Sequence, residues 1–263
     1  MASWAPYLPP RISGIKEISR MSAPSEDKTA APTAPLNVKA VFFDFEGTLV
    51  DFQWQLKPAV EECLQALSAI GFKRECYGSD PSYAYLYNHT RKLSLESKGK
   101  DGLAADMAVI DRIYDKYDAD ALTRWNLYPD TLETLTTLNR LGFQLGLISN
   151  IGRSALDAAM QRLDLSGRIS VVISRNEVNE LKPGPEGLLR AATVCAVEPK
   201  HCIFIGDSRN DVGAARKAGM LAAYLSGGED TPAAMAQQPA DVEIDRLSRL
   251  PSILHRIDSH DHP

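Results

Sequence analysis

An apolar run that ends in two acids is the feature that most constrains this chain. Residues 38–43 are apolar apart from Lys39, which is the pattern of a buried strand. Asp44 ends the run, and Glu46 and the turn-forming pair Gly47-Thr48 follow. Two neighbouring carboxylates repel each other, and ligands bind at the carboxyl ends of strands in open α/β sheets. The run therefore predicts a site for a divalent metal or a proton-transfer pair; the alternative is a solvated acidic turn.

Three later segments also place polar residues after apolar runs. Ser149-Asn150 follows the predicted strand 143–148, Lys182 precedes Pro183, and Asp207 and Asp211 follow the predicted strand 201–205. A hydroxyl between a strand and a helix N-terminus suits a phosphoryl oxygen, although an ordinary helix cap is the alternative for Ser149. Two acids four residues apart can face one pocket and offer the oxygen ligands that Mg²⁺ prefers. The alternatives are a surface lysine for Lys182 and helix-dipole compensation for Asp211.

Strands and helices alternate from residue 125 to residue 225, which predicts a parallel sheet with right-handed crossovers. Between the first strand and the rest of the sheet, helical periodicity recurs over residues 58–71, 81–97 and 103–117, with a break at 98–102. This is an all-helical insert. We also expect a loop over 227–240, an edge strand over 241–244 and a last amphipathic helix over 247–257.

The four motifs together resemble those of the haloacid dehalogenase-like (HAD) hydrolases. Asp44-Phe45-Glu46-Gly47-Thr48-Leu49-Val50 is similar to the family's first motif, Asp-x-Asp-Gly-Thr-Leu. Ser149-Asn150, Lys182-Pro183 and the run Gly206-Asp207-Ser208-Arg209-Asn210-Asp211 resemble the later motifs in the same order. The resemblance covers residues 37–257. It implies a Rossmann-like, doubly wound parallel sheet with a helical cap of the first type (C1) after the first strand.

The resemblance also implies the residue roles, and it points to the phosphoglycolate phosphatase-like branch. Asp44 is expected to attack phosphorus and form an aspartyl-phosphate, and Glu46 to transfer protons to the leaving oxygen and from water. Ser149, Asn150 and Lys182 are expected to bind the phosphoryl group. The implied cofactor is Mg²⁺, held by Asp44, the Glu46 backbone carbonyl, Asp207 and Asp211. The expected reaction is hydrolysis of a small-molecule phosphomonoester.

Glu46 departs from the family pattern, because most phosphatases of the family carry Asp at this position. The enolase-phosphatase branch also has Glu here, whereas haloacid dehalogenases have a non-acidic residue. The departure leaves a second hypothesis open, in which the chain is a catalytically weak binding or regulatory protein with the HAD fold. A phosphomutase and a dehalogenase are further alternatives.

The predicted organisation has four parts. Residues 1–36 are expected to form a disordered tail rich in Pro, Ala and Ser. Residues 37–56 and 125–257 form the predicted sheet domain, residues 57–124 the cap, and residues 258–263 a frayed end.

Composition excludes several other functional classes. The formal net charge is -5, with 29 basic and 34 acidic residues, so we expect no nucleic-acid partner. No apolar run approaches the ~20 residues of a membrane helix, so no membrane partner is expected either. The four cysteines lack metal-ligand spacing, and reduced thiols predict a cytoplasmic protein.

Overall fold

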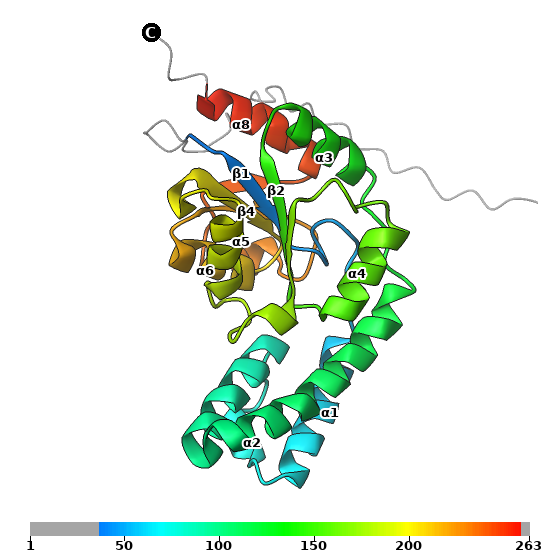
Figure 1. Cartoon of the computed structure of the whole chain (residues 1–263), viewed down its shortest axis with the longest axis vertical. Coiled ribbons are helices and arrows are strands. Elements are labelled where there is room, and N and C mark those ends of the chain that lie inside the picture. The colour runs from blue at the N-terminus through cyan, green and yellow to red at the C-terminus, as the bar shows by residue number, and fades with distance from the viewer. Residues whose placement is uncertain (1–36, 259–263) are drawn as a thin grey trace, which may run out of the picture. The chain divides into compact units, whose positions relative to one another are not determined.

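A computed structural model describes residues 37–258. The predicted tail 1–36 and residues 259–263 lie outside the described residues. The sheet has six parallel strands in the order β3-β2-β1-β4-β5-β6, with β1, β2 and β4 side by side at its centre (Figure 1). The strands are β1 (Ala40–Phe43), β2 (Gln144–Ile148), β3 (Val171–Ile173), β4 (Cys202–Gly206), β5 (Leu221–Leu225) and β6 (Val242–Ile244).

Helices cover both faces of the sheet. Side chains alternate along a strand, so Ala40 and Phe42 of β1 pack in one apolar cluster while Val41 and Phe43 pack in the other. Helices α5 (Glu186–Val194) and α6 (Arg209–Ala218) contribute to the first cluster. Helices α3 (Thr131–Arg140), α4 (Arg153–Arg162) and α8 (Leu250–Asp258) contribute to the second (Figure 1). The predicted Rossmann-like, doubly wound fold is confirmed.

A helical insert follows β1, and its first helix begins one residue before the predicted bound at residue 57. It holds α1 (Leu56–Ala69), the 3₁₀ turn η1 (Arg74–Tyr77) and α2 (Tyr83–Leu122). Inside α2, Gly99 has φ 66° and ψ -165°, which are not helical angles, so the helix breaks within the predicted interruption at 98–102. The division into a cap domain and a sheet domain at these residue numbers stays a prediction.

Two parts of the C-terminal third differ from expectation. The sequence pattern did not single out β5, whose Leu-Ala-Ala-Tyr-Leu sequence is rich in alanine, a residue that is depleted in strands. The expectation of an unbroken loop over 227–240 is wrong at the short helix α7 (Pro232–Met235). Thr231 caps this helix by accepting a hydrogen bond from Ala234 N, and Pro232 fits its first turn. The 3₁₀ turns η2 (Arg175–Glu177), η3 (Pro199–His201) and η4 (Leu247–Arg249) complete the chain.

Two linkers, residues 51–55 and 123–127, connect the insert to the sheet, and they are joined to each other. Asp51 N donates to the Asn126 carbonyl at 3.0 Å, and Asn126 N donates to Asp51 Oδ1 at 2.7 Å. Arg124 Nη2 donates to the Gln53 carbonyl at 3.0 Å. Displacement of one linker therefore draws the other with it.

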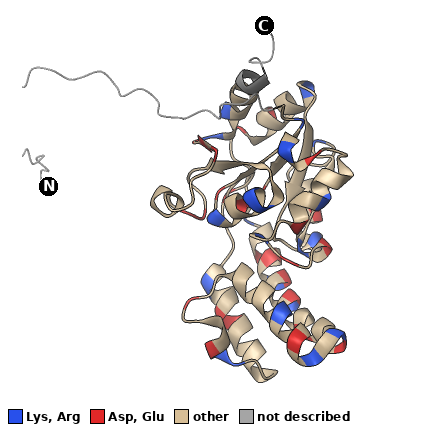
Figure 2. Cartoon of the chain, turned by 90° about the vertical axis from the view of Figure 1, so that its left-hand side faces the viewer, with Lys and Arg blue, Asp and Glu red and all other residues tan. Residues whose placement is uncertain are grey.

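The described residues carry mixed charge on their helices and contain no helix suited to a membrane. Lys and Arg are interspersed with Asp and Glu along the helices in the view of Figure 2. Among residues 37–258, no helix combines the length and the apolar character that crossing a membrane requires.

Candidate active site

The sheet topology brings the predicted polar clusters to one edge. β1 lies between β2 and β4, and Phe43 is in register with Leu147 on one side and Ile205 on the other. Ser149 and Asp207 lie two residues past these partners and Asp44 lies one residue past Phe43, so all three meet at the carboxyl edge of the sheet. Because each residue lies just past a buried strand, its backbone position is fixed by the sheet.

Lys182 lies between two of the predicted acids. Its Nζ is 2.6 Å from Asp44 Oδ1 and 2.7 Å from Asp211 Oδ1, and its side chain is 4 % exposed. Burial alone would lower the pKa of Lys182, but the carboxylates of Asp211 and Asp44 hold that pKa above its ordinary value. The lysine is therefore a fixed positive charge beside Asp44.

Asp44 and Asp207 are buried acids whose negative charge, when they are ionised, the protein compensates only in part. Burial raises the pKa of Asp44 to about 6, although Lys182 opposes the shift. Burial, together with Asp211 and Asp44, raises the pKa of Asp207 to about 9. Among residues 37–258, the Asp207 carboxylate accepts a hydrogen bond only from Glu229 N, at 2.5 Å. A cation at this position would relieve the repulsion among the acids.

The donor set fits a small hard cation. Asp44, Asp207 and Asp211 each offer a carboxylate oxygen, and these oxygens all lie within 4.8 Å of one another. Mg²⁺ binds through a few carboxylates and keeps several of its waters. Asp211 has both oxygens engaged, Oδ1 with Lys182 and Oδ2 with Ser208 N at 3.1 Å and Ser208 Oγ at 2.5 Å. Asp44 and Asp207 are thus the better candidates for direct ligands.

Two glycines leave room for Asp207. A Cβ added at Gly47 would lie 2.0 Å from Asp207 Oδ2, and one at Gly228 would lie 1.9 Å from the same atom. Gly47 also has φ +78°, a conformation that side chains disfavour. The turn after Glu46 and the loop before Glu229 can therefore approach this carboxylate only because they lack side chains there.

Glu46 is held by three N–H donors. Its Oε1 accepts from Gln53 N at 2.6 Å, Trp54 N at 2.6 Å and Trp125 Nε1 at 2.8 Å. Among the described residues, no donor contacts Oε2, which leaves that oxygen for a proton-transfer partner. Burial raises the pKa of Glu46 to about 7, although the three donors lower it. A carboxyl group with such a pKa can both give and accept a proton near neutral pH.

Ser149 and Asn150 lie beside this group of charges. Ser149 Oγ accepts from Ile151 N at 3.2 Å, so its hydroxyl proton is available to a ligand. The Asn150 amide joins two segments, since Nδ2 donates to the Tyr83 hydroxyl at 3.0 Å and Oδ1 accepts from Lys182 N at 3.1 Å. All seven residues that the sequence predicted are thus found around one edge of the sheet, and their roles stay predictions.

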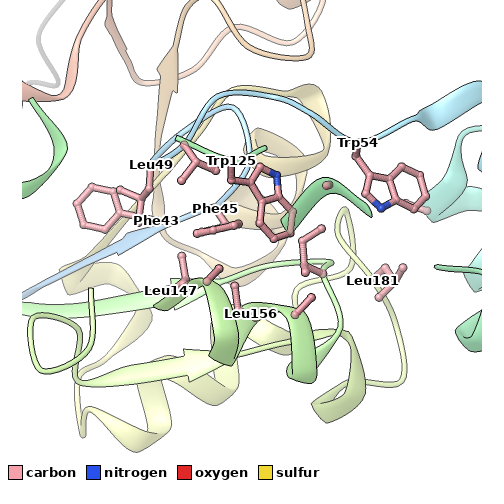
Figure 3. Close-up of a cluster of buried hydrophobic side chains, with 14 of the residues drawn as sticks. Phe43, Phe45, Leu49, Trp54, Trp125, Leu147, Leu156 and Leu181 are labelled. Atoms are coloured by element: carbon pink, nitrogen blue, oxygen red, sulfur yellow. The ribbon is translucent and has the colours of Figure 1, made fainter. Parts of the chain in front are cut away.

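Sequence reasoning missed the two tryptophans of the linkers. Trp125 packs edge-on against Phe45 with ring centroids 5.0 Å apart, and both lie in the buried apolar cluster of Figure 3. Trp54 reaches toward the insert, where its Nε1 donates to Asp118 Oδ1 at 2.8 Å. The Trp125 indole and the Trp54 backbone N–H both donate to Glu46. No local pattern predicts these contacts, because their partners are 64 to 79 residues away in the chain.

A buried arginine that no motif includes fixes helix α2 against the sheet domain. The Arg175 side chain is 1 % exposed and pairs with Asp111 at 3.3 Å, with Asp118 at 3.0 Å, and with Asp115. Its Nη1 also donates to the Asn150 carbonyl at 3.1 Å. The three acids recur along α2 at spacings of four and three residues, which places them on one face of the helix. That spacing is the one signal the sequence offered.

A pocket adjoins Glu46 between the insert and the sheet domain. Four of its nine lining residues are aromatic, among them Trp54, Tyr83 and Tyr114, and Asp118 and Asn150 are among the polar ones. The protein therefore has a charged centre at the strand ends and a partly aromatic pocket that Glu46 lines.

Comparisons with known proteins agree with the fold. A model of the family "haloacid dehalogenase-like hydrolase" matches residues 38–219. The chain belongs to this family, and within it the chain is a phosphoric monoester hydrolase.

Relatives and solved structures match over most of the chain. It is 31% identical over 230 residues to a phosphoglycolate phosphatase of Salmonella choleraesuis (strain SC-B67), covering 81% of this chain and 91% of that one. It is 30% identical to phosphoglycolate phosphatase 1 of Pseudomonas aeruginosa, covering 81% and 78%. A HAD-superfamily hydrolase (subfamily IA, variant 1) from Geobacter sulfurreducens PCA superposes with a TM-score of 0.51 at 21% identity, covering 82% and 99%. That structure supports the fold.

Proposed function

We propose that the chain is a Mg²⁺-dependent phosphatase that hydrolyses a small-molecule phosphomonoester through an aspartyl-phosphate on Asp44. The observation that carries the proposal is the Asp44 carboxylate, placed 2.6 Å from Lys182 and within 4.8 Å of two further acids. A nucleophile beside a fixed positive charge can approach an anionic phosphoryl group.

The chain's own residues account for both halves of the reaction. Asp44 attacks phosphorus and the bond to the leaving oxygen breaks, while Glu46 gives that oxygen a proton through Oε2. Glu46 then takes a proton from water, whose oxygen attacks the phosphorus of the aspartyl-phosphate. Inorganic phosphate leaves and the Asp44 carboxylate is restored. Lys182, Ser149 and Asn150 hold the phosphoryl oxygens during both steps.

Asp44, Asp207 and the Glu46 backbone carbonyl would hold Mg²⁺, with Asp211 supporting it directly or through water. When bound, the ion supplies positive charge that offsets the repulsion between phosphate and carboxylate. The raised pKa of Asp207 supports this assignment, because its cause is a buried, crowded set of acids.

The second hypothesis, a catalytically weak binding or regulatory protein, rests on Glu in place of Asp at position 46. The three N–H donors on Oε1 argue for an enzyme, because they fit the length of the Glu side chain. The cytoplasm is the proposed compartment, since all four cysteines are unpaired, as expected in a reducing environment.

The test is release of p-nitrophenol from p-nitrophenyl phosphate, with and without Mg²⁺, for the wild type, Asp44→Asn and the control Asp101→Asn. Asp101 is an exposed acid of the insert. We expect Mg²⁺-dependent release by the wild type and the control, and loss of release in Asp44→Asn. Equal release by Asp44→Asn, or release that persists in EDTA, would refute the proposal.

A further inference from the structure

The pocket beside Glu46 bears on which leaving group this enzyme accepts. If Glu46 protonates the leaving oxygen, as proposed above, the rest of the leaving group must extend into the space that Glu46 lines. About 270 Å³ lies between its lining atoms, counting the part open to solvent, and the space that a water-sized body can enter is far smaller. The residues that line the pocket therefore limit the size and charge of the leaving group. This inference rests on the proposed function.

The walls carry no available positive charge. Among residues 37–258, none of those that line the pocket is Lys or Arg. The basic side chains nearby are already paired: Arg124, whose charge interacts with Glu46, pairs with Asp120, and Lys182 contacts Asp44 and Asp211. Arg175 is buried and pairs with three acids of α2. A carboxylate that entered this pocket would lose its water without gaining a charged partner.

The two acids of the lining do not form a cation site either. Asp118 Oδ1 accepts from Trp54 Nε1, and Oδ2 accepts from Gly152 N at 2.9 Å and from Arg175 at 3.0 Å. Its charge is therefore balanced within the protein. Glu46 has one oxygen held by three donors and the other assigned to the reacting oxygen. When ionised, Glu46 repels a carboxylate, and when protonated, its single proton goes to the leaving oxygen.

The remaining walls are largely aromatic and aliphatic. Trp54 lies 5.2 Å from Tyr83 and 5.3 Å from Tyr114 between ring centroids, and Phe52 and Leu56 complete the apolar side. Such walls bind an apolar body through its buried area and through ring contacts.

We propose that the enzyme selects phosphomonoesters of uncharged alcohols with an apolar or aromatic body, and that it disfavours a leaving group that carries a carboxylate. Glycolate is a leaving group of the disfavoured kind. The chain's pocket thus predicts a preference different from the substrate in the names of its relatives.

Three phosphates of two-carbon alcohols that differ in charge test this preference. They are 2-phosphoglycolate, ethyl phosphate and 2-aminoethyl phosphate, whose leaving groups are anionic, neutral and cationic; benzyl phosphate adds an aromatic body. The measurement is kcat/KM for inorganic phosphate release with Mg²⁺. We expect benzyl and ethyl phosphate to exceed 2-phosphoglycolate by about 10²-fold, and to exceed 2-aminoethyl phosphate. A preference for 2-phosphoglycolate or for 2-aminoethyl phosphate would overturn the inference while leaving the phosphatase activity established. Hydrolysis of none of the four would overturn both.

A pair of variants links the preference to the pocket. Leu56 lines the pocket at the start of α1 and is partly buried. Leu56→Lys adds a cation, and Leu56→Gln is a neutral control that also places a polar group there. We expect the ratio of kcat/KM for 2-phosphoglycolate over ethyl phosphate to rise about tenfold in the Lys variant and to stay unchanged in the Gln variant. An unchanged ratio in both would show that the leaving group does not lie in this pocket. Because the readout is a ratio within one protein, partial loss of folding does not affect it.

Discussion

Shortening Glu46 to Asp tests whether the site is built around the longer side chain. The substitution restores the residue found in most phosphatases of the family, but it draws the carboxylate back by about one C–C bond, ~1.5 Å. Glu46 Oε1 now accepts three hydrogen bonds of 2.6–2.8 Å, from two backbone N–H groups and from the Trp125 indole. Each would lengthen to about 4 Å, beyond the range of a hydrogen bond.

The loss can be estimated from these contacts. A displacement of about 1 Å in a reacting group lowers the rate on the order of 10²-fold, or ~2.7 kcal/mol of transition-state stabilisation. The Trp125 indole is fully buried, so its unpaired N–H adds about 1–3 kcal/mol to the cost in folding stability. Glu46→Asp should therefore lose both turnover and stability.

The assay is Mg²⁺-dependent phosphate release combined with urea unfolding, with Glu46→Gln as the matched variant. The Gln amide oxygen can accept the same three hydrogen bonds, so the Gln variant should keep its stability but lose proton transfer and hence turnover. Equal or higher turnover in Glu46→Asp would refute the reasoning and indicate that the site has drifted from Asp. If Glu46→Asp lost only stability and kept its turnover, Glu46 would have no role in the reaction.

Three further predictions follow from burial and charge. Arg175→Met should lower the free energy of unfolding by about 3–5 kcal/mol, because it leaves the buried Asp118 unpaired; urea unfolding measures this, and a loss below about 1 kcal/mol would contradict it. In metal-free protein, burial raises the pKa of Glu46 to about 7 and that of Asp207 to about 9, so the folded state binds more protons than the unfolded state above about pH 4.5. The melting temperature of the metal-free protein should therefore fall as the pH rises from 5 to 8, and added Mg²⁺ should raise it most at pH 8. A melting temperature that does not change with pH would show that these two pKa values are not raised. Iodoacetamide should label Cys76 alone in the native protein, as mass spectrometry would show, because Cys76 is exposed and the other three cysteines are buried; a second adduct would refute this.

The sequence predicted the sheet and its carboxyl edge because both depend on local patterns. An apolar run that ends in a polar residue, as at Asp44 and Asp207, indicates both a buried strand and the position of a ligand. Strand β5 was missed because its alanines carry little strand preference. Segment 221–225 forms a strand because it pairs with β4 and β6 on either side, and not because of the strand preference of its own residues.

The environment of Glu46 was not predictable in the same way. Its donors lie on the two linkers, and the Trp125 donor is 79 residues away along the chain. Arg175 likewise meets partners 57 to 64 residues away. A single sequence contains no signal for such pairings, since a tryptophan or an arginine at these positions could serve equally well in a core or on the surface. The motif predicted that Glu46 is a functional acid, and only the fold showed which groups donate hydrogen bonds to it.

The joined linkers have an optical consequence. Each carries one tryptophan, and the indole N–H of each donates to a carboxylate, Trp125 to Glu46 and Trp54 to Asp118. The third tryptophan of the chain, Trp4, lies outside the described residues. Indole emission shifts with the charge and polarity around the ring, so any motion of the insert relative to the sheet would alter both linker fluorophores together. The protein thus carries a built-in spectroscopic probe at the joined linkers, and no label has to be introduced to follow them.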